Sequence, residues 1–418
     1  MPGASSPADW GSARLAGSDA LSLALIDARN HTLAWLAHFE AVLEPGALRA
    51  APAPGLDAPL LAAGRIGWFQ ERWIARNTQR ARGPQCDASL PRQPSITPLA
   101  DVWFDPALAA DADADAADVA SRAPRHRLPD AQAVRDHLAA GIETTLELLE
   151  RAGEDDTALY CYRLALHAED ALAEHFAVTL QATGAPLGDA AGLLGARPTP
   201  HPRAPLTLGA TRWMLGTGPT GFAPDCERPA HPVALPEFEI DAQAVSWSQY
   251  AEFVADGGCD DPRWWHPEGW QWLQRTSRRV PAYVSQMRQG VLLRQFANEL
   301  RVPLDQPAVH LSWFEADAWC RWAGRRLPSE AEWESAACRA GSRGFRWGDV
   351  WEWTSNTFRP YPGFEAGPGN ASAPHFGTSR VVRGASFATR ERQRDPHARR
   401  ALPADTDHVY VGFRSCAL

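Results

Sequence analysis

Two arginines near the end of an apolar-periodic segment are spaced so that they could bind one anion. Arg76 and Arg80 lie four residues apart, and the segment from Leu60 to Arg80 carries apolar residues mostly at helical spacing. Residues four apart share one face of an α-helix, so both guanidinium groups could face the same anion. The alternative is that both are solvated residues at a helix end.

Two further sets of side chains have types and spacing that could do chemistry. Trp351 and Trp353 flank Glu352, and an indole face can hold a quaternary ammonium group. Packing in the core is the alternative for both. His31 and His38 lie seven residues apart and could share a helix face, or they could be ordinary surface or capping residues.

The composition excludes several classes of protein. With 418 residues, 45% hydrophobic and 22% charged, the chain is long enough for two or three folded domains and is not intrinsically disordered. All 41 basic residues are Arg, and they are spread among 50 acidic residues, which argues against a nucleic-acid or membrane-surface patch. An odd count of seven Cys without a CxxC pair, no signal segment and no long apolar run predict a reduced, cytoplasmic protein.

The elements that must position these residues change character halfway along the chain. The first half predicts four helices and therefore a bundle, over Asp19 to Leu43, Leu60 to Arg80, Pro129 to Arg151 and Asp156 to Thr183. Gly83 to Arg127 is interpreted as a surface crossover. Four prolines between Gly188 and Pro205 indicate a linker, after which a new domain begins.

The second half predicts an irregular α+β domain rich in Trp, Gly and Pro. Helices are expected over Ser246 to Gly257 and Ser312 to Ala340, because Ser246 with Gln249 and Ser312 with Glu315 have the spacing of capping boxes. Short strands are expected over Val233 to Ile240 and Arg380 to Ala385.

Several segments of the second half carry a family resemblance. They are GFAPDCERPAHPVALPEFEIDAQAVSWSQYAEFVADGG, WWHPEGWQWL, PAVHLSWFEADAWCRWAGRRLPSEAEWESAA, GDVWEWTSNTFRPYPGF, VVRGASFATR and GFRSCA. In this order they resemble the formylglycine-generating-enzyme type of domain, which has a C-type-lectin-like α+β fold. With GRIGWFQERWIARN and YRLALHAEDALAEHF in the first half, the whole chain is similar to the ergothioneine-biosynthesis sulfoxide synthases and selenoneine synthases.

The resemblance implies an α+β fold in three parts. A DinB-like four-helix bundle is expected over 19–187, a Pro-rich linker over 188–205 and the formylglycine-generating-enzyme-type domain over 206–418. In the family, a non-heme iron(II) held by three His joins a thiol or selenol donor to hercynine, the trimethylated betaine of histidine. The resemblance implies that substrate-binding side chains come from Arg76, Arg80, Trp351, Trp353, Arg383, Arg399 and Arg400.

The three metal-ligand positions of the family depart from its pattern. One His is expected just before WFxE and two more in His-x-x-x-His-x-Glu, and these positions read Arg65, Ala168 and Leu172 here. Neither Ala nor Leu can ligate a metal, and a guanidinium would repel one. A shared site must still bring the three positions together in space, facing the C-terminal domain. His167 and Glu174 are the remaining substitutes, although His167 lies about 100° round the helix from the expected ligand.

Two functions from different classes follow. One is an iron-dependent synthase that forms a C–S or C–Se bond to hercynine. The other is a metal-free paralogue that binds a small ligand, such as a hercynine-like betaine or a thiol or selenol donor, in the cleft between the domains, or binds a partner protein. Fold alone does not decide between them.

Overall fold

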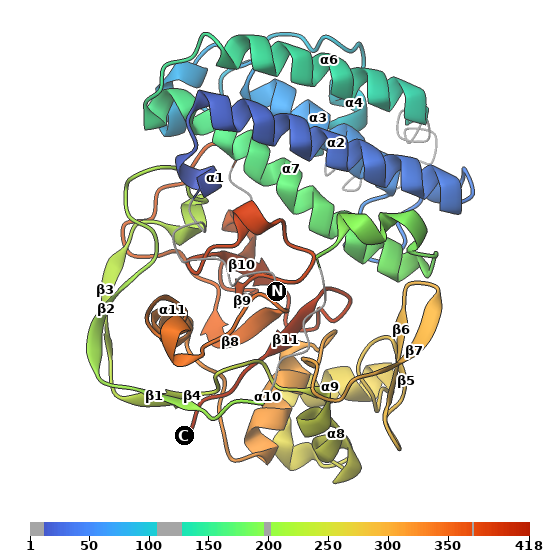
Figure 1. Ribbon diagram of the computed structural model, residues 1–418, viewed down its shortest axis with the longest axis vertical. Coiled ribbons are helices and arrows are strands. Elements are labelled where there is room, and N and C mark those ends of the chain that lie inside the picture. The colour runs from blue at the N-terminus through green and yellow to red at the C-terminus, as the bar shows by residue number, and fades with distance from the viewer. Residues whose placement is uncertain (1–11, 107–127, 196–201, 370–371) are drawn as a thin grey trace.

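The computed structural model describes residues 12–106, 128–195, 202–369 and 372–418. Its first half is helical, and the helices α2, α3, α6 and α7 pack against one another as a bundle at the top of Figure 1. The helices are α1 (Ser12–Leu15), α2 (Ser18–Val42), α3 (Pro59–Trp73), α4 (Ala100–Phe104), α6 (Ala131–Leu149) and α7 (Asp156–Thr183). None of the described helices is long and apolar enough to cross a membrane.

The helix ends follow from capping chemistry, with one exception. The Asp130 side chain accepts a hydrogen bond from the Ala133 amide at 2.8 Å, and α7 ends at Gly184 with a φ of 72°, which favours glycine. The exception is α3, which ends at Trp73 rather than at Arg80 as the periodicity predicts. The last two predicted turns are therefore not α-helical.

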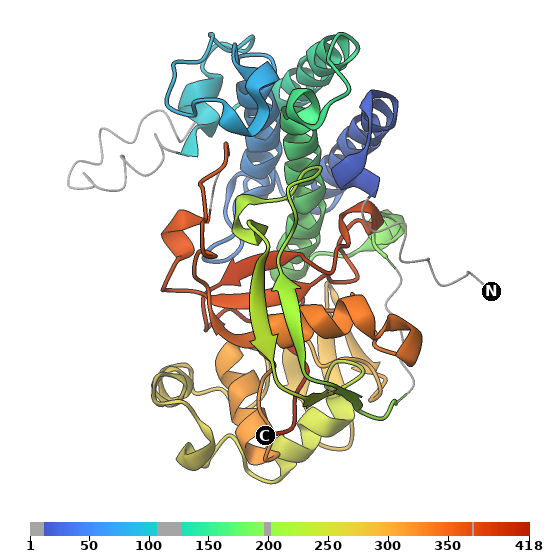
Figure 2. The same cartoon turned by 90° about the vertical axis from the view of Figure 1, so that its left-hand side faces the viewer.

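The second half is a mixed α+β domain around a four-stranded sheet of order β10-β9-β8-β11, with only β8 and β11 parallel. Figure 2 shows the β2–β3 hairpin running from the side of this domain up to the bundle. The strands are β1 (Leu206–Leu208), β2 (Thr211–Leu215), β3 (His231–Leu235), β4 (Phe238–Ile240), β5 (Val284–Gln286), β6 (Val291–Gln295), β7 (Asn298–Val302), β8 (Trp351–Thr357), β9 (Arg380–Gly384), β10 (Arg399–Leu402) and β11 (Val411–Phe413). The helices are α8 (Trp247–Ala255), α9 (Pro267–Thr276), α10 (Trp313–Trp322) and α11 (Glu330–Arg339). The predicted fold class, a helical bundle followed by an α+β domain, is confirmed.

Both predicted capping boxes are present, at the starts of α8 and α10. The single helix predicted over Ser312 to Ala340 is wrong, because the chain breaks after α10 at Gly324, where φ is 64°. It restarts as α11 with a third capping box, in which Ser329 pairs with Glu332. The Ser-Glu spacing at 329 and 332 was available as a signal for that second start.

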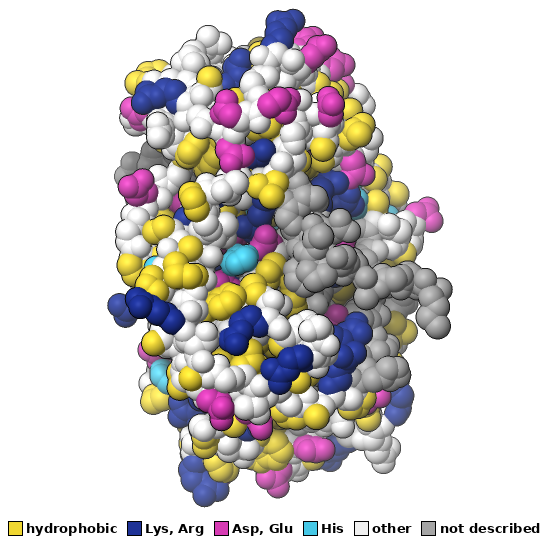
Figure 3. All heavy atoms as spheres, turned by 60° about the vertical axis from the view of Figure 1, so that its left-hand side comes forward, with side chains coloured by type: hydrophobic (Ala, Val, Ile, Leu, Met, Phe, Trp, Pro, Cys, Tyr) yellow, Lys and Arg dark blue, Asp and Glu magenta, His cyan; other side chains and the backbone are white. Residues whose placement is uncertain are grey.

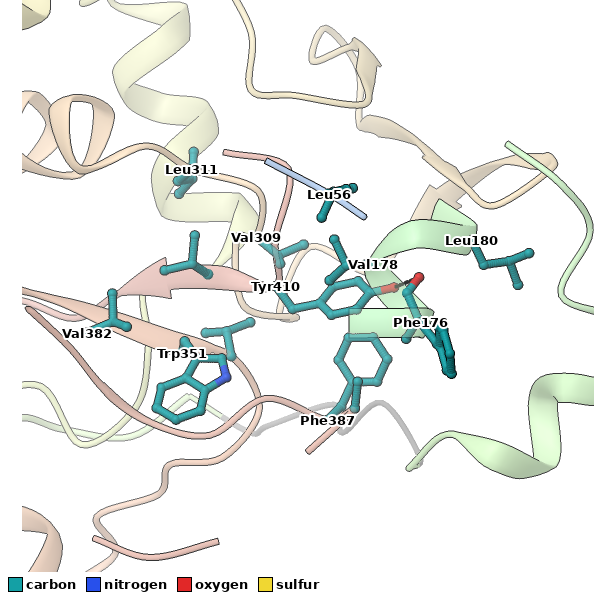
Figure 4. Packing of buried hydrophobic residues seen from close by; sticks show 14 of the residues in the cluster. Leu56, Phe176, Val178, Leu180, Val309, Leu311, Trp351, Val382, Phe387 and Tyr410 are labelled. Atoms are coloured by element: carbon teal, nitrogen blue, oxygen red, sulfur yellow. Dashed lines mark hydrogen bonds between the residues drawn. The ribbon is translucent and has the colours of Figure 1, made fainter. Parts of the chain in front are cut away.

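The bundle and the α+β domain share one hydrophobic core. Figure 4 shows Phe176 and Val178 of α7 beside Tyr410 and Phe387 of the second half, and the Tyr410 hydroxyl donates to the Ala177 carbonyl at 3.2 Å. In the segment predicted as a linker, Gly188–Leu193 form a 3-10 helix, and 196–201 lie outside the described residues. Residues 107–127 of the predicted crossover also lie outside them.

The surface agrees with the charge pattern of the sequence. On the face shown in Figure 3, basic, acidic, hydrophobic and neutral side chains are interspersed over the bundle and the domain below it.

A buried ion pair ties α11 to the central sheet. Arg383 of β9 is fully buried, pairs with Glu334 and donates to the Pro396 carbonyl at 3.0 Å. Glu334 also accepts from the Trp213 indole at 3.0 Å and from the Gly216 amide at 2.9 Å. A buried charge without its partner is costly, so both members are required.

The change Glu334→Gln should lower the free energy of unfolding by about 3–5 kcal/mol, because it leaves the buried Arg383 guanidinium with only the Glu330 carboxylate, 3.9 Å away and already paired with Arg399. Urea denaturation followed by tryptophan fluorescence measures this loss. The exposed Glu268→Gln on α9 is the matched control and should change stability by less than about 0.5 kcal/mol. Equal effects of the two changes would contradict a structural role for the pair.

Candidate functional site

The three positions where the family pattern places metal ligands line one cavity. Ala168 and Leu172 lie one turn apart on α7, and Arg65 lies on α3, which packs against α7. The cavity has a volume of about 330 Å³ and its other walls include Ile66 and Trp68. The three positions thus lie at one cavity, as expected, but its lining comes from the first half of the chain, so the expectation that they face the C-terminal domain is wrong.

The side chains at these positions do not fit a metal. Arg65 forms an ion pair with Asp57 through Nη1 and Oδ2 at 2.5 Å, and the other two positions offer only hydrocarbon. Ferrous iron in proteins takes imidazole and carboxylate ligands, whereas a guanidinium stays protonated and has no lone pair to donate. Across the part of the chain that the structure describes, no three His, Cys, Asp or Glu side chains are grouped so that they could hold a metal ion.

The carboxylate of Glu174 is occupied by donors from the second half of the chain. It accepts hydrogen bonds from the Trp351 indole at 2.8 Å and from the Ser386 hydroxyl at 2.6 Å. The Arg400 guanidinium at 2.9 Å and the Thr389 hydroxyl at 3.2 Å complete the set. Both oxygens of Glu174 thus join α7 to β8, β10 and the loop between β9 and β10, and the prediction of Glu174 as a substitute metal ligand stays a prediction.

His167, the other substitute, faces away from the cavity of the three positions. Its Nδ1 lies 2.9 Å from the Gln393 amide oxygen, and its ring packs near Phe222. Burial lowers the pKa of His167. The neighbouring Asp170 accepts two hydrogen bonds from Arg392, at 2.6 and 2.8 Å, and one from Gln393 at 2.8 Å. His167 and Asp170 thus contact the second half of the chain and are not free to share a metal.

A second cavity, of about 280 Å³, lies on this other side of α7. His167 and Asp170 line it from α7, while Trp351, Arg399 and Arg400 line it from the sheet. The structure thus brings three of the predicted substrate-binding residues together here.

The aromatic faces at this cavity are already covered by cations. The Arg400 guanidinium lies 4.2 Å from the ring centroid of Trp351, which is 4% exposed. Arg399 lies 4.4 Å from the Phe358 centroid and pairs with Glu330 at 2.7 Å. A ligand ammonium would have to displace Arg400 to reach the indole face.

The remaining predicted substrate-binding residues do not meet at either cavity. Trp353 is fully buried and donates to the Leu311 carbonyl at 2.7 Å, and Arg383 is the partner of Glu334 described above. The indole of Trp353 therefore packs in the core, which was the alternative to a substrate-binding role.

The expectation that Arg76 and Arg80 share a helix face is wrong, because α3 ends before them. Arg76 is 5% exposed and binds Asp101 through both terminal nitrogens, at 2.7 and 2.8 Å. Arg80 begins a 3-10 helix, Arg80–Gln85, and donates to the Ile74 carbonyl at 3.2 Å. Each guanidinium binds a group of the chain itself.

Sequence reasoning missed the partners that α7 finds in the segment between β9 and β10. Ser386, Thr389, Arg392 and Gln393 all donate to acidic residues of this helix. The three arginines of the run RERQRD, at 390–395, indicate that acidic side chains lie nearby in the fold. Nothing in the run shows that these acidic side chains belong to a helix more than 200 residues earlier.

The change Glu174→Gln should lower the free energy of unfolding by about 1–3 kcal/mol, since a neutral amide cannot satisfy four donors that the carboxylate accepts. Denaturation in urea measures the loss, and hydrogen exchange of residues 386–400 should become faster than in the native protein. The exposed Glu147→Gln on α6 serves as control. Unchanged exchange of 386–400 would show that Glu174 does not hold this segment to α7.

Comparison with known proteins relates both halves of the chain to one kind of enzyme. The family model described as the sulfatase-modifying factor enzyme 1-like domain matches residues 202–349 and 347–417. The hercynine oxygenase of Mycobacterium tuberculosis is 30% identical over 396 residues, covering 82% of this chain and 86% of that protein. The hercynine oxygenase of Mycolicibacterium thermoresistibile is 30% identical over 425 residues, covering 88% of each chain. That of Mycolicibacterium smegmatis is 35% identical over 212 residues, covering 39% of this chain and 49% of that protein.

Proposed function

The chain belongs to the hercynine oxygenase family, and from that premise we propose that it is a metal-free member that binds a small ligand and does not carry out an iron-dependent C–S or C–Se bond formation. The observation that carries the proposal is the cavity at which Arg65, Ala168 and Leu172 stand together. A three-imidazole site would need nitrogen donors at these three places.

The neighbouring acidic side chains give this proposal further support. Glu169, which directly follows Ala168, accepts from Arg29 at 2.7 Å and from Thr32 at 3.0 Å inside the bundle. Asp170 and Glu174 bind the second half of the chain. To coordinate iron, each of these carboxylates would have to leave its cationic donors, and for Glu169 the donor Arg29 is buried, so the loss would cost several kcal/mol.

The proposed ligand is a small zwitterion such as a hercynine-like betaine, held in the 280 Å³ cavity between α7 and the sheet. Its walls carry side chains of both charge signs, Asp170 and Arg400 among them, and a zwitterion presents both signs as well. The thiol or selenol donor of the family reaction is the alternative ligand of this cavity.

The second candidate function is the family's own synthase reaction. Identity of 30% over most of the length of two hercynine oxygenases favours it. It would require metal ligands other than the side chains at the three positions, so metal content separates the two proposals.

After anaerobic loading with ferrous iron and gel filtration, the native protein should retain far less than one iron per chain by elemental analysis. The variant with Arg65→His, Ala168→His and Leu172→His should gain iron binding, since two imidazoles one helical turn apart and a third from α3 would then face one cavity. Loss of the Leu172 side chain costs about 2–5 kcal/mol, so circular dichroism must first show that this variant is folded.

The matched control carries Gln at the same three positions and should bind no more iron than the native protein. Tight binding of one iron per native chain would overturn the metal-free proposal. Calorimetric titration of the metal-free native protein with hercynine tests the ligand, and heats equal to those of dilution would refute the betaine.

A further inference from the structure

We propose that the cavity formed by the former metal-ligand positions is a binding site for a carboxylate that carries an apolar tail, with the Arg65 guanidinium as the group that receives the acid. This cavity is distinct from the one between α7 and the sheet. The inference rests on the proposed function in one respect only, namely that no metal occupies these positions.

The guanidinium of Arg65 has an edge that its ion pair does not use. Asp57 binds Nη1, and the Nε atom is buried with no hydrogen-bond partner among the described residues. Nε and Nη2 together form one of the two edges through which Arg binds a carboxylate in bidentate fashion. A buried donor without an acceptor is unfavourable, so an oxygen from a ligand would satisfy a group that the chain leaves unpaired.

A second polar atom at the same cavity lacks a partner. His175 lies one turn after Ala171 on α7, and its Nε2 is buried without a hydrogen-bond partner among the described residues. Burial lowers the pKa of His175, which favours the neutral ring, and the ring also has a hydrogen bond to the backbone of Asp57. Arg65, Asp57 and His175 are the charged or titratable side chains that line this cavity, so an anion would meet one paired carboxylate, the guanidinium and the imidazole ring.

The remaining walls of this cavity are apolar side chains, and they favour an apolar group at the end of the ligand away from its carboxylate. Ile66, Trp68 and Phe69 line the cavity from α3, and Ala168 and Leu172 line it from α7. The volume of about 330 Å³ is at the small end of the range for organic ligands. An acid with a short aromatic or branched tail therefore fits both the polar end and the apolar walls.

The test uses 3-phenylpropanoate as the probe, titrated calorimetrically into the full-length native protein in the presence of EDTA. The neutral 3-phenylpropanamide has the same tail and should bind at least about 10-fold more weakly, because it cannot pair with the guanidinium. Arg65→Gln should weaken binding of the acid by at least about 10-fold and leave binding of the amide unchanged. Arg65→Lys keeps the charge without the fork and should fall between the two.

Arg400→Gln, in the other cavity, is the control for location and should leave binding of the acid unchanged. Equal affinity for acid and amide would overturn the proposal, as would an Arg65→Gln variant that binds the acid as well as the native protein does. If Arg65→Gln does not fold, the comparison of acid and amide on the native protein decides. Metal content of a separate EDTA-free sample, loaded with ferrous iron and gel-filtered as above, separates the failures: if that sample holds no iron, failure to bind the acid refutes this inference alone, and if it holds one iron per chain, the proposed function is refuted as well.

Discussion

The arrangement of the two halves depends on one buried carboxylate, that of Glu174. A buried charge must be paired, and Glu174 finds its four donors on β8, on β10 and on the loop that joins β9 to β10. Because these donors lie on three separate segments, they can converge on one carboxylate only when the sheet, the loop and α7 are all in place. The interaction therefore fixes the position of the segment that forms both the second-half wall of the 280 Å³ cavity and the contacts to Asp170.

The α7 helix, which carries Glu174, presents a different environment on each of its faces. Phe176 and Val178 belong to the core that both halves share, and Glu169 binds Arg29 inside the bundle. Ala168 and Leu172 face the cavity beside α3. Since apolar burial and carboxylate pairing already join the halves, the positions facing the cavity can change from imidazole to hydrocarbon without removing a contact that holds the domains together.

Local signals in the sequence predicted helices, whereas pairing between residues far apart in the sequence determines the contacts at the candidate site. Capping boxes, Asp130 and Gly184 are read within a few residues, so most helix boundaries followed from the sequence. The pairing of Arg76 with Asp101 bridges an insert without periodicity, and the pairing of Glu174 with Arg400 spans more than half the chain. The family motif around Ala168 and Leu172 could be aligned because it lies on a regular helix. The groups that donate hydrogen bonds to the carboxylates of that helix lie far away in the sequence, so spacing could not predict them.

The nature of the replacement at the site is itself informative. A site that has merely lost its metal needs no new charge, yet Arg65 places a permanent cation at the position of an imidazole ligand, with Asp57 as its counter-ion. The cavity thus places a paired guanidinium beside apolar walls. A metal activates a bound molecule through coordination, but a guanidinium only orients an anion through hydrogen bonds and charge. On the proposed function, the Arg65 side chain would therefore serve recognition of a ligand at this cavity rather than its activation.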